Sequence, residues 1–430
     1  MKIGGTAFTT PDYGIFLLPK IIGDDKMKLV DELKDRGLIY QMTYPEELEQ
    51  KLNEESITFY VGFDCTADSL TAGHYLVITL MKRLQMAGHK PICLIGGGTT
   101  LIGDPSGRND MRSLMGTDFI DHNAERFKAQ LSRFLNIDGV NGFFANNGDW
   151  LRNLNFLDFN REIGVHFLVN NMLNLDSYKN RLKDGLTFFE FSYMLLQSYD
   201  FLKLYRDYGC TLQVGGSDQW SNILGGYDLV RKIENANVYA MTIPLLVNAD
   251  GVKMGKSMGN AIWLDEEKTS VYDLYQYFRN VDDRDVEKFL KQLTFLSLDN
   301  IDDIIKNEDI NRQKEILAFE ITKDIHGEEK ARTAMETARS LFSGEMDLLN
   351  MPSFEIDKEL IKDGIGILNL LVETGLCSSN SEARNLVKGG GVTIDDEKID
   401  DPRATLNANR FEKDIVIKKG KKTFLKVSVK

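Results

Sequence analysis

Residues 57–88 restrict the possible folds of this chain more than any other stretch. A short β-branched and apolar run at 57–59 leads into the polar stretch Tyr60–His74, and an apolar pattern of helical period continues to Gly88. This order predicts a strand, a turn and a helix, the repeating unit of α/β proteins. The helix N-terminus would offer unpaired N–H groups, and Gly73 would let a phosphate approach the backbone closely. The polar side chains expected at the mouth of the strand are those of Asp64, Thr66, Thr71 and His74.

The length and composition of the chain narrow the class of protein. A chain of 430 residues is too long for one ordinary core, so we expect two to four domains. The net charge of −13 excludes a protein that coats nucleic acid non-specifically, although a local basic patch remains compatible with it. The four cysteines form no C-x-x-C pair, which excludes a zinc ribbon and argues against a disulfide framework. No apolar run approaches the ~18–20 residues of a membrane span, so we expect a cytoplasmic protein.

A second strand, predicted at Lys90–Ile95, runs into a glycine-rich loop at 96–107. A dinucleotide-binding fingerprint would require glycine at the position of Leu101, so the loop argues against a Rossmann cofactor site. The glycines still permit a close approach of the backbone. Arg108 and Arg112 follow on a polar loop, where most arginines are solvated surface charges.

The stretch Phe188–Tyr208 predicts a helix that ends at Gly209. Polar side chains at helical spacing lie along one face of this helix, namely those of Tyr193, Gln197 and Asp200. Their neighbours in the sequence are mostly apolar, which argues against a stripe that simply faces water. Polar groups that are buried in this way need hydrogen-bond partners.

A strand predicted from Thr211 carries Asp218 and Gln219 at its carboxyl end, the edge at which open α/β sheets bind ligands. A further apolar run leads into Lys253–Ser257, which contains the sequence Gly-Lys-Ser. A P-loop would need glycine where Asp250 stands and a helix after the serine, so this segment is not a P-loop. We interpret it as a flexible, lysine-bearing loop that folds over phosphates.

Changes in hydrophobic periodicity and in composition divide the chain into successive parts. Residues 1–26 show no period and are interpreted as an extension, disordered or left from cloning. The parts expected after it are an α/β part at 27–250, the lysine-bearing loop at 251–260, a helical part at 261–345, a linker at 346–356 and a small α+β unit at 357–430. The last unit ends in a lysine-rich tail, for which RNA phosphate is the expected partner in an otherwise acidic protein.

Several spaced motifs together resemble those of class I aminoacyl-tRNA synthetases, in particular the bacterial-type tyrosyl-tRNA synthetases. The motifs are Thr71–His74, Tyr193 with Gln197 and Asp200, Gly215–Trp220, and Lys253–Ser257. The resemblance covers about residues 27–430 and implies a homodimer whose tRNA spans both subunits. It also implies a Rossmann-like parallel-sheet catalytic domain, an all-helical anticodon-region domain and a small C-terminal RNA-binding module. The chain departs from the family at Thr71, where the first histidine of the motif usually stands.

The resemblance implies that the chain activates L-tyrosine with ATP, releases pyrophosphate and transfers the tyrosyl group to the 3′ end of tRNA(Tyr). The first step needs no side-chain base, because the carboxylate of tyrosine is already ionised at neutral pH. Catalysis then depends on positioning and on stabilising charge at the phosphates. Mg²⁺ would accompany ATP and be held mainly by the phosphates, and no resident metal site is expected.

The same resemblance assigns roles to individual residues. Catalysis at the phosphates would use Lys253, Lys256, Thr66, Thr71, His74, Arg108 and Arg112. Tyrosine would contact Tyr60, Asp104, Tyr193, Gln197, Asp200, Thr99, Gln213 and Gln219, of which Tyr60 and Asp200 would bind the phenolic hydroxyl. ATP would contact Gly62, Asp64, Gly73, His74, Gly216, Asp218, Lys253, Lys256 and Ser257, with Asn147 on the same side.

Two other functions are compatible with parts of this pattern. A tryptophanyl-tRNA synthetase would share the fold and both signature motifs, but the pair Tyr60 and Asp200 and the C-terminal unit favour tyrosine. An RNA-binding paralogue without catalysis would be expected to have lost its phosphate-binding lysines, whereas Lys253 and Lys256 are both present.

Overall fold

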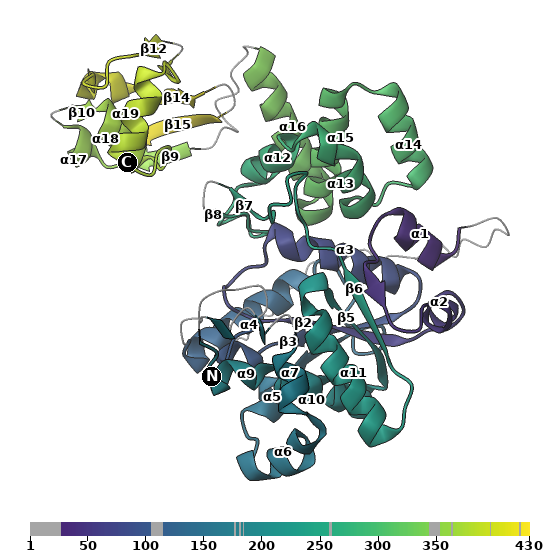
Figure 1. Ribbon diagram of the computed structural model, residues 1–430. Coiled ribbons are helices and arrows are strands. Elements are labelled where there is room, and N and C mark those ends of the chain that lie inside the picture. Colours follow the sequence, from purple (N-terminus) through teal and green to yellow (C-terminus); the bar gives the residue numbers. More distant parts are fainter. Residues whose placement is uncertain are drawn as a thin grey trace, which may run out of the picture.

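A computed structural model describes residues 27–104, 115–175, 178–179, 182–183, 185–257, 260–343, 353–362, 364–395, 397–420 and 423–430. The N-terminal extension at 1–26, Arg108 and Arg112, and most of the predicted linker lie outside the described residues. The described chain forms a sheet with helices on both faces, a cluster of helices next to it and a small C-terminal α+β unit beside that cluster (Figure 1).

A six-stranded sheet organises the first part of the chain, in the order β1-β6-β5-β2-β3-β4. The strands are β1 (Gln41–Met42), β2 (Thr58–Phe63), β3 (Lys90–Ile95), β4 (Phe143–Asn146), β5 (Cys210–Gly216) and β6 (Tyr239–Ile243). Strands β2 to β6 are parallel, as predicted, and the short edge strand β1 pairs antiparallel with β6. The chain extends the sheet from β2 first through β3 and β4 and then, on the other side, through β5 and β6. The topological switch point therefore lies between β2 and β5, where a ligand site is expected.

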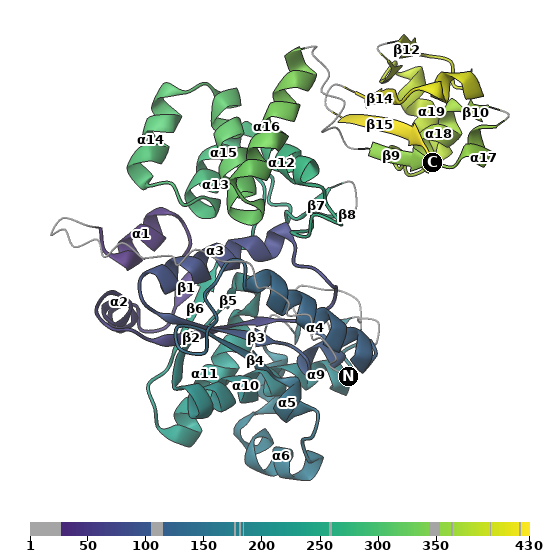
Figure 2. The ribbon, with the colours of Figure 1, turned by 180° about the vertical axis from the view of Figure 1, so that it is seen from behind.

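Helices cover both faces of this sheet. They are α3 (Ala72–Met86), α4 (Thr117–Leu131), α10 (Tyr193–Tyr208) and α11 (Trp220–Glu234). Phe59, Val61 and Phe63 of β2 belong to one apolar core together with residues of α3 and α4, whereas Tyr60 packs in a second core with α10 and α11. Figure 1 shows α10 and α11 over one face of the sheet, and Figure 2 shows α4 over the other. The alternation of side chains along β2 thus directs Tyr60 towards α10.

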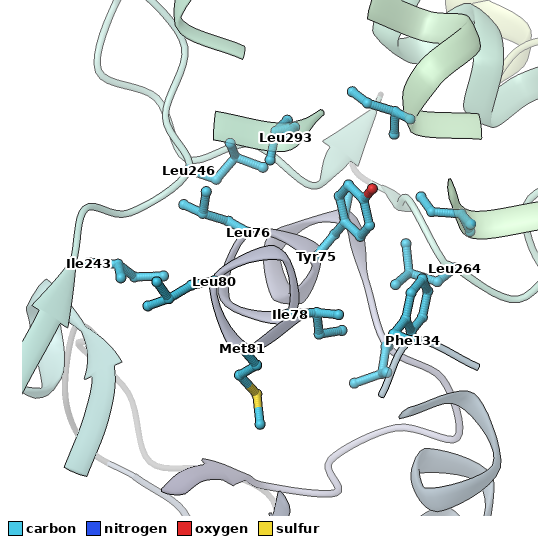
Figure 3. Packing of buried hydrophobic residues seen from close by; sticks show 14 of the residues in the cluster. Tyr75, Leu76, Ile78, Leu80, Met81, Phe134, Ile243, Leu246, Leu264 and Leu293 are labelled. Carbon is cyan, nitrogen blue, oxygen red and sulfur yellow. The ribbon is translucent and has the colours of Figure 1, made fainter. Parts of the chain in front are cut away.

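Helix α3 is buried on nearly all sides, which is expected of a helix that is apolar all round. Figure 3 looks along it and shows the buried side chains of Tyr75, Leu76, Ile78, Leu80 and Met81 pointing in different directions. Leu76 lies near Leu246, which follows β6, and near Leu293 of the helical cluster (Figure 3). The N-terminus of α3 is therefore held against both the sheet and the helical cluster.

The helical cluster consists of α12 (Val271–Arg279), α13 (Val286–Leu293), α14 (Leu298–Asn307), α15 (Ile310–His326) and α16 (Glu328–Ser343). Its buried residues, including Leu293 and Leu317, belong to the same apolar core as α3. A half-buried acid strengthens this contact, because Asp324 of α15 accepts hydrogen bonds from Tyr75 and Lys82 of α3. The helices predicted here therefore share one apolar core with the sheet.

The C-terminal unit has a five-stranded sheet in the order β12-β11-β14-β15-β9. Its elements are β9 (Ser353–Ile356), α17 (Lys358–Ile361), β10 (Ile365–Gly366), α18 (Ile367–Glu373), α19 (Asn380–Lys388), β11 (Val392–Ile394), β12 (Glu397–Ile399), β13 (Thr405–Leu406), β14 (Ile415–Lys419) and β15 (Thr423–Val429). A separate apolar core, drawn from residues between Ile356 and Val427, fills the unit. The unit is thus built around a core of its own.

The strand predicted at Lys90–Ile95 is found with those bounds. Two local predictions are wrong. The stretch from Tyr60 onward is predicted as a turn, but it continues β2 to Phe63, because its aromatic and β-branched side chains suit an extended, half-buried strand. The helix predicted from Phe188 is divided at Ser192, whose hydroxyl donates to the Phe189 carbonyl (2.7 Å).

The division at Ser192 gives a short helix, α9 (Phe188–Phe191), followed by α10. The remaining short elements are α1 (Leu29–Asp35), α2 (Pro45–Glu54), α5 (Gly148–Leu151), α6 (Phe156–Glu162), α7 (Val169–Leu173), β7 (Lys256–Ser257) and β8 (Asn260–Ala261). Among the described residues, no helix is both long and apolar enough to cross a membrane.

Candidate active site

A cavity of about 440 Å³ opens at the carboxyl ends of β2 and β5, where the strand order places a ligand site. All of the residues predicted to contact tyrosine line it: Tyr60, Thr99, Asp104, Tyr193, Gln197, Asp200, Gln213 and Gln219. The residues predicted for ATP that line it are Gly62, Asp64, Gly73, His74, Gly216, Asp218 and Lys253. Residues from strands, helices and loops that are far apart in the sequence therefore meet in one cavity.

Some predicted residues are not placed at the cavity. Thr66 is half-buried in the turn after β2 and is not among the cavity-lining residues of the described chain. The backbone of Lys256 and Ser257 forms β7, but their side chains lie outside the description. Arg108 and Arg112 lie outside the described residues altogether. The contacts predicted between these residues and the phosphates remain predictions.

The innermost end of the cavity holds a buried carboxyl group. Asp200 is 1% exposed and accepts hydrogen bonds from Asn147 Nδ2 (2.9 Å) and Trp150 Nε1 (2.8 Å). Burial raises the pKa of Asp200 to about 8, and these two hydrogen bonds oppose the shift without cancelling it. Tyr60 is equally buried, and desolvation raises the pKa of its hydroxyl well above the usual value. This end of the cavity therefore presents a neutral phenol beside a carboxyl group that loses its proton reluctantly.

Three buried polar atoms at the cavity have no hydrogen-bond partner among the described residues. They are Tyr60 Oη, Gln197 Oε1 and Gln213 Oε1. Leaving such a group unpaired in the interior costs about 1–3 kcal/mol, so folded proteins rarely keep several together without a reason. The arrangement is that of a site whose ligand supplies the missing polar partners.

Two further acids stand along the cavity wall with fixed neighbours. Asp64 accepts hydrogen bonds from the Thr99 hydroxyl (2.8 Å) and the Tyr193 hydroxyl (3.1 Å). Asp104 accepts one from Gln219 Nε2 (2.6 Å). These negative charges suit a ligand that carries an ammonium group. In the part of the chain that the structure describes, no three His, Cys, Asp or Glu side chains come together as a metal site.

The position of Asn147 differs from its prediction. The sequence places Asn147 with ATP, but its amide donates to Asp200 Oδ2 (2.9 Å) and to Thr99 Oγ1 (2.9 Å), at the inner end of the cavity. Trp150 was not singled out in the sequence, although it lies only three residues after Asn147, in α5. Asn222, whose Nδ2 lies 3.5 Å from Asp104 Oδ1, was also missed. Helical spacing from Gln219 is the signal that could have identified it.

The glycines after β3 have a structural reason that the sequence did not reveal. A Cβ atom on Gly96 would lie 2.4 Å from Asp64 Oδ1, and one on Gly97 would lie 2.2 Å from Asn146 Oδ1. These contacts are far too short for real atoms, so a larger residue would displace the neighbouring side chains. Gly96 thus lets Asp64 reach its place at the cavity, and Gly97 makes room for Asn146.

The N-terminus of α3 is capped by two of its own residues, Thr71 and His74. Thr71 is the N-cap residue, and its backbone N–H donates to His74 Nδ1 (3.0 Å), so the neutral ring carries its proton on Nε2. The Thr71 hydroxyl oxygen also lies 3.0 Å from Nδ1. Burial between Phe63 and Phe127 lowers the pKa of His74 to about 4. His74 is therefore a neutral hydrogen-bond donor at the cavity at neutral pH.

The lysine-bearing loop lies across the same mouth of the cavity. Lys253 Nζ is 3.4 Å from Asp218 Oδ2, and the lysine side chain is 58% exposed. Such a loose surface pair holds the ammonium group only weakly. The segment directly after the loop is tied to α3, since the Ala72 N–H donates to the Ile262 carbonyl (2.8 Å). Lys253 is thus placed at the cavity and free to engage an anion there.

Comparison with protein families gives two matches along the chain. Residues 52–343 match the family described as tRNA synthetases class I (W and Y). Residues 345–427 match the C-terminal domain described as tyrosine--tRNA ligase SYY-like. The first match spans the parallel strands of the sheet, the cavity and the helical cluster.

Individual relatives agree with these matches. The chain is 49% identical over 400 residues to a protein of Lachnoclostridium phytofermentans named tyrosine--tRNA ligase, covering 92% of this chain and 98% of that one. It is 49% identical over 403 residues to a protein of the same name from Clostridium kluyveri, covering 93% and 99%. Among solved structures, a C-terminally truncated mitochondrial tyrosyl-tRNA synthetase of Aspergillus nidulans matches with a TM-score of 0.66 and 30% identity. That match covers 74% of this chain and 95% of the other.

Proposed function

This chain belongs to the family of class I tRNA synthetases for tryptophan and tyrosine, and we propose that it uses the described cavity to activate L-tyrosine with ATP and to charge tRNA(Tyr). One observation carries the assignment of the cavity. The buried Tyr60 hydroxyl has no partner among the described residues and stands in the same inner end as Asp200. A phenolic hydroxyl is a group that can donate to the carboxyl group and accept from Tyr60 at once.

The remainder of tyrosine would lie along the wall of the cavity. Its ammonium group would be held by the acids Asp64 and Asp104 and by Tyr193, with the orphaned Gln197 oxygen as a further acceptor. Gln219, which is hydrogen-bonded to Asp104, would face the carboxylate. An amino acid without the phenolic hydroxyl would leave the buried polar groups unpaired, which is the general basis of discrimination in such pockets; tyrosyl-tRNA synthetase is itself the worked example of this principle.

ATP would lie at the outer side of the cavity, along Gly62, Gly216 and Asp218, as its magnesium complex. A carboxylate oxygen of tyrosine attacks the α-phosphorus, and the bond from that phosphorus to the bridging oxygen breaks as pyrophosphate leaves. The charge that moves onto pyrophosphate would be met by Lys253, together with Lys256, Arg108, Arg112 and Thr66. His74, neutral and with its proton on Nε2, and Thr71 would donate from the α3 side.

The tyrosyl group would then pass to the 3′ end of tRNA. We propose that residues 27–250 perform the chemistry, that 261–345 face the anticodon region and that 357–430 bind RNA. We also propose a cytoplasmic location, because the pool of free tRNA is found there. The alternative amino acid, tryptophan, has an indole N–H donor but no hydroxyl oxygen to accept from Tyr60, so it is not favoured.

We further propose a homodimer. Large apolar side chains that are more than half exposed occur between α6 and α9: Phe156, Leu157, Val165, Leu168, Val169 and Phe188. Exposed apolar groups in such numbers mark a surface that another protein covers. Sedimentation of the purified chain measures this directly, and a single species with the mass of one chain would exclude the dimer.

The proposed reaction is tested by amino-acid-dependent exchange of pyrophosphate into ATP. We expect exchange with tyrosine and none above background with phenylalanine or tryptophan, because the inner end of the cavity requires a hydroxyl group. All twenty amino acids are compared at equal concentration. Equal exchange with tryptophan, or no exchange with any amino acid, would refute the assignment.

A second test concerns Thr71. We expect Thr71→Val to slow formation of tyrosyl-adenylate at least about tenfold with little change in the KM for tyrosine, because the hydroxyl acts at the phosphates directly or through His74. Thr79→Val is the matched control, since the Thr79 hydroxyl bonds the Leu76 carbonyl in the interior of the same helix (2.8 Å). Single-turnover adenylation at the parental rate in Thr71→Val would make the residue a bystander.

A further inference from the structure

The glycine in the middle of the lysine-bearing loop is hydrogen-bonded on two sides, and the start of α3 lies close to it on a third. The Gly255 N–H donates to Tyr277 Oη (2.9 Å), and its carbonyl accepts from the Ile262 N–H (2.7 Å). On the third side a Cβ atom at this position would lie 3.2 Å from the Gly73 nitrogen at the start of α3. Gly255 has φ of +99°, which only glycine adopts readily. The backbone of the loop therefore passes close to the backbone at the helix N-terminus, with no room for a side chain between them.

Tyr277 approaches Gly255 from another part of the structure. It lies on α12 of the helical cluster, and its ring packs edge-on against Phe278 at 5.2 Å between ring centroids. The ring is also packed against the main apolar core. Burial raises the pKa of Tyr277, although the hydrogen bond from Gly255 opposes the shift, so the hydroxyl is a neutral acceptor at neutral pH. A rigid helix thus presents one acceptor to the loop.

The hydrogen bond between Gly255 and Tyr277 lies at a point in the loop where it can affect the positions of both lysines. Gly255 stands two residues after Lys253 and directly before Lys256. Its hydrogen bond with Tyr277 fixes the backbone between the two lysines at a place that lies close to the α3 N-terminus. A displacement of about 1 Å at a group that acts on the reacting atoms is enough to reduce a rate strongly.

We propose that Tyr277 is a positioning residue for adenylate formation, whose hydroxyl holds the lysine-bearing loop closed against the N-terminus of α3. This role rests on the function proposed above, because Tyr277 would fix the conformation of the loop that is proposed to contact the phosphates of ATP. The hydrogen bond between Gly255 and Tyr277 also links the loop to the helical cluster, so the packing of α12 contributes to the geometry of the cavity.

The test is Tyr277→Phe, which removes the hydroxyl and keeps the ring. We expect the single-turnover rate of tyrosyl-adenylate formation to fall by about threefold to tenfold, the range of one neutral hydrogen bond, with the KM for tyrosine unchanged. Tyr272→Phe is the matched control, because the Tyr272 hydroxyl accepts from Gln276 within the same helix (2.8 Å) and makes no contact with the loop among the described residues. It should retain the parental rate.

A second measurement follows the loop itself. Lys253 is exposed, so trypsin cuts after it in proportion to the fraction of molecules in which the loop is released. Tyr277→Phe should raise this cleavage rate at least about threefold over the parent, and Tyr272→Phe should not. An unchanged rate of adenylation or of cleavage in Tyr277→Phe, or equal losses in both variants, would overturn the proposal. Absence of exchange in the parent would instead refute the proposed function.

Discussion

Replacing Lys253 by alanine is expected to slow tyrosyl-adenylate formation by about 10²–10³-fold, with the KM for tyrosine nearly unchanged. The Lys253 ammonium group stands at the mouth of the cavity, 3.4 Å from Asp218 Oδ2, and its side chain is 58% exposed. Breaking its loose ion pair with Asp218 therefore costs little free energy when the ammonium group binds an incoming phosphate instead. Charge accumulates on pyrophosphate only as the bond to the α-phosphorus breaks, so the lysine acts on the transition state rather than on bound tyrosine. Single-turnover kinetics with saturating tyrosine and ATP measure the effect.

Lys268→Ala is the control for this variant. Lys268 pairs with Asp68 (2.7 Å) and lies over the Trp263 ring, close to the loop in sequence but outside the cavity-lining residues of the described chain. It should adenylate at the parental rate. Lys253→Arg keeps the charge and should recover part of the lost rate. A parental rate in Lys253→Ala, or equal losses in Lys253→Ala and Lys268→Ala, would show that the ammonium group of Lys253 has no specific role.

Much of the site could be predicted because its residues follow from local order along the chain. Asp218 and Gln219 come directly after a strand, and Tyr193, Gln197 and Asp200 repeat at helical spacing. Such patterns need no knowledge of the tertiary structure. The fold class could be predicted for the same reason, since strands and helices alternate and the parallel sheet follows from that order. Local order also explains why β3 has the predicted bounds.

The contacts that were missed depend on long-range packing. Trp150 and Asn147 reach Asp200 across 50 and 53 residues of sequence, and no spacing rule connects them. Gly96 is explained by Asp64, which directly follows the neighbouring strand β2. The exception is Thr71 with His74, which is a contact between residues i and i+3 at a helix start. A capping interaction of that kind could have been predicted, had histidine been considered in place of the usual glutamate or glutamine.

The second large effect is expected when the chain is stopped after Pro352. Charging of tRNA should fall at least about 100-fold, whereas tyrosine-dependent exchange should stay within about twofold of the parent. Such a stop removes β9 together with β15, its parallel partner, and hence the whole C-terminal sheet. All of the described residues that line the cavity lie between Tyr60 and Lys253 and remain. Charging with purified tRNA and exchange are measured on the same preparation.

The C-terminal unit can be removed because it has a core of its own. Val416 and Phe424 are the described residues of the unit that belong to the main core instead, so the stop exposes little additional apolar surface.

The tail lysines are not all available to RNA, since Lys419 pairs with Glu382 (3.0 Å) and Lys426 with Asp414 (3.5 Å). Exposed cations such as Lys413 must then account for the binding of phosphate, and charging by the full chain should weaken with salt more steeply than charging by the truncated chain. Retention of charging after truncation would contradict an RNA-binding role for the unit. An equal loss of exchange in a truncated chain with an unchanged circular dichroism spectrum would contradict the separation of adenylation from RNA binding.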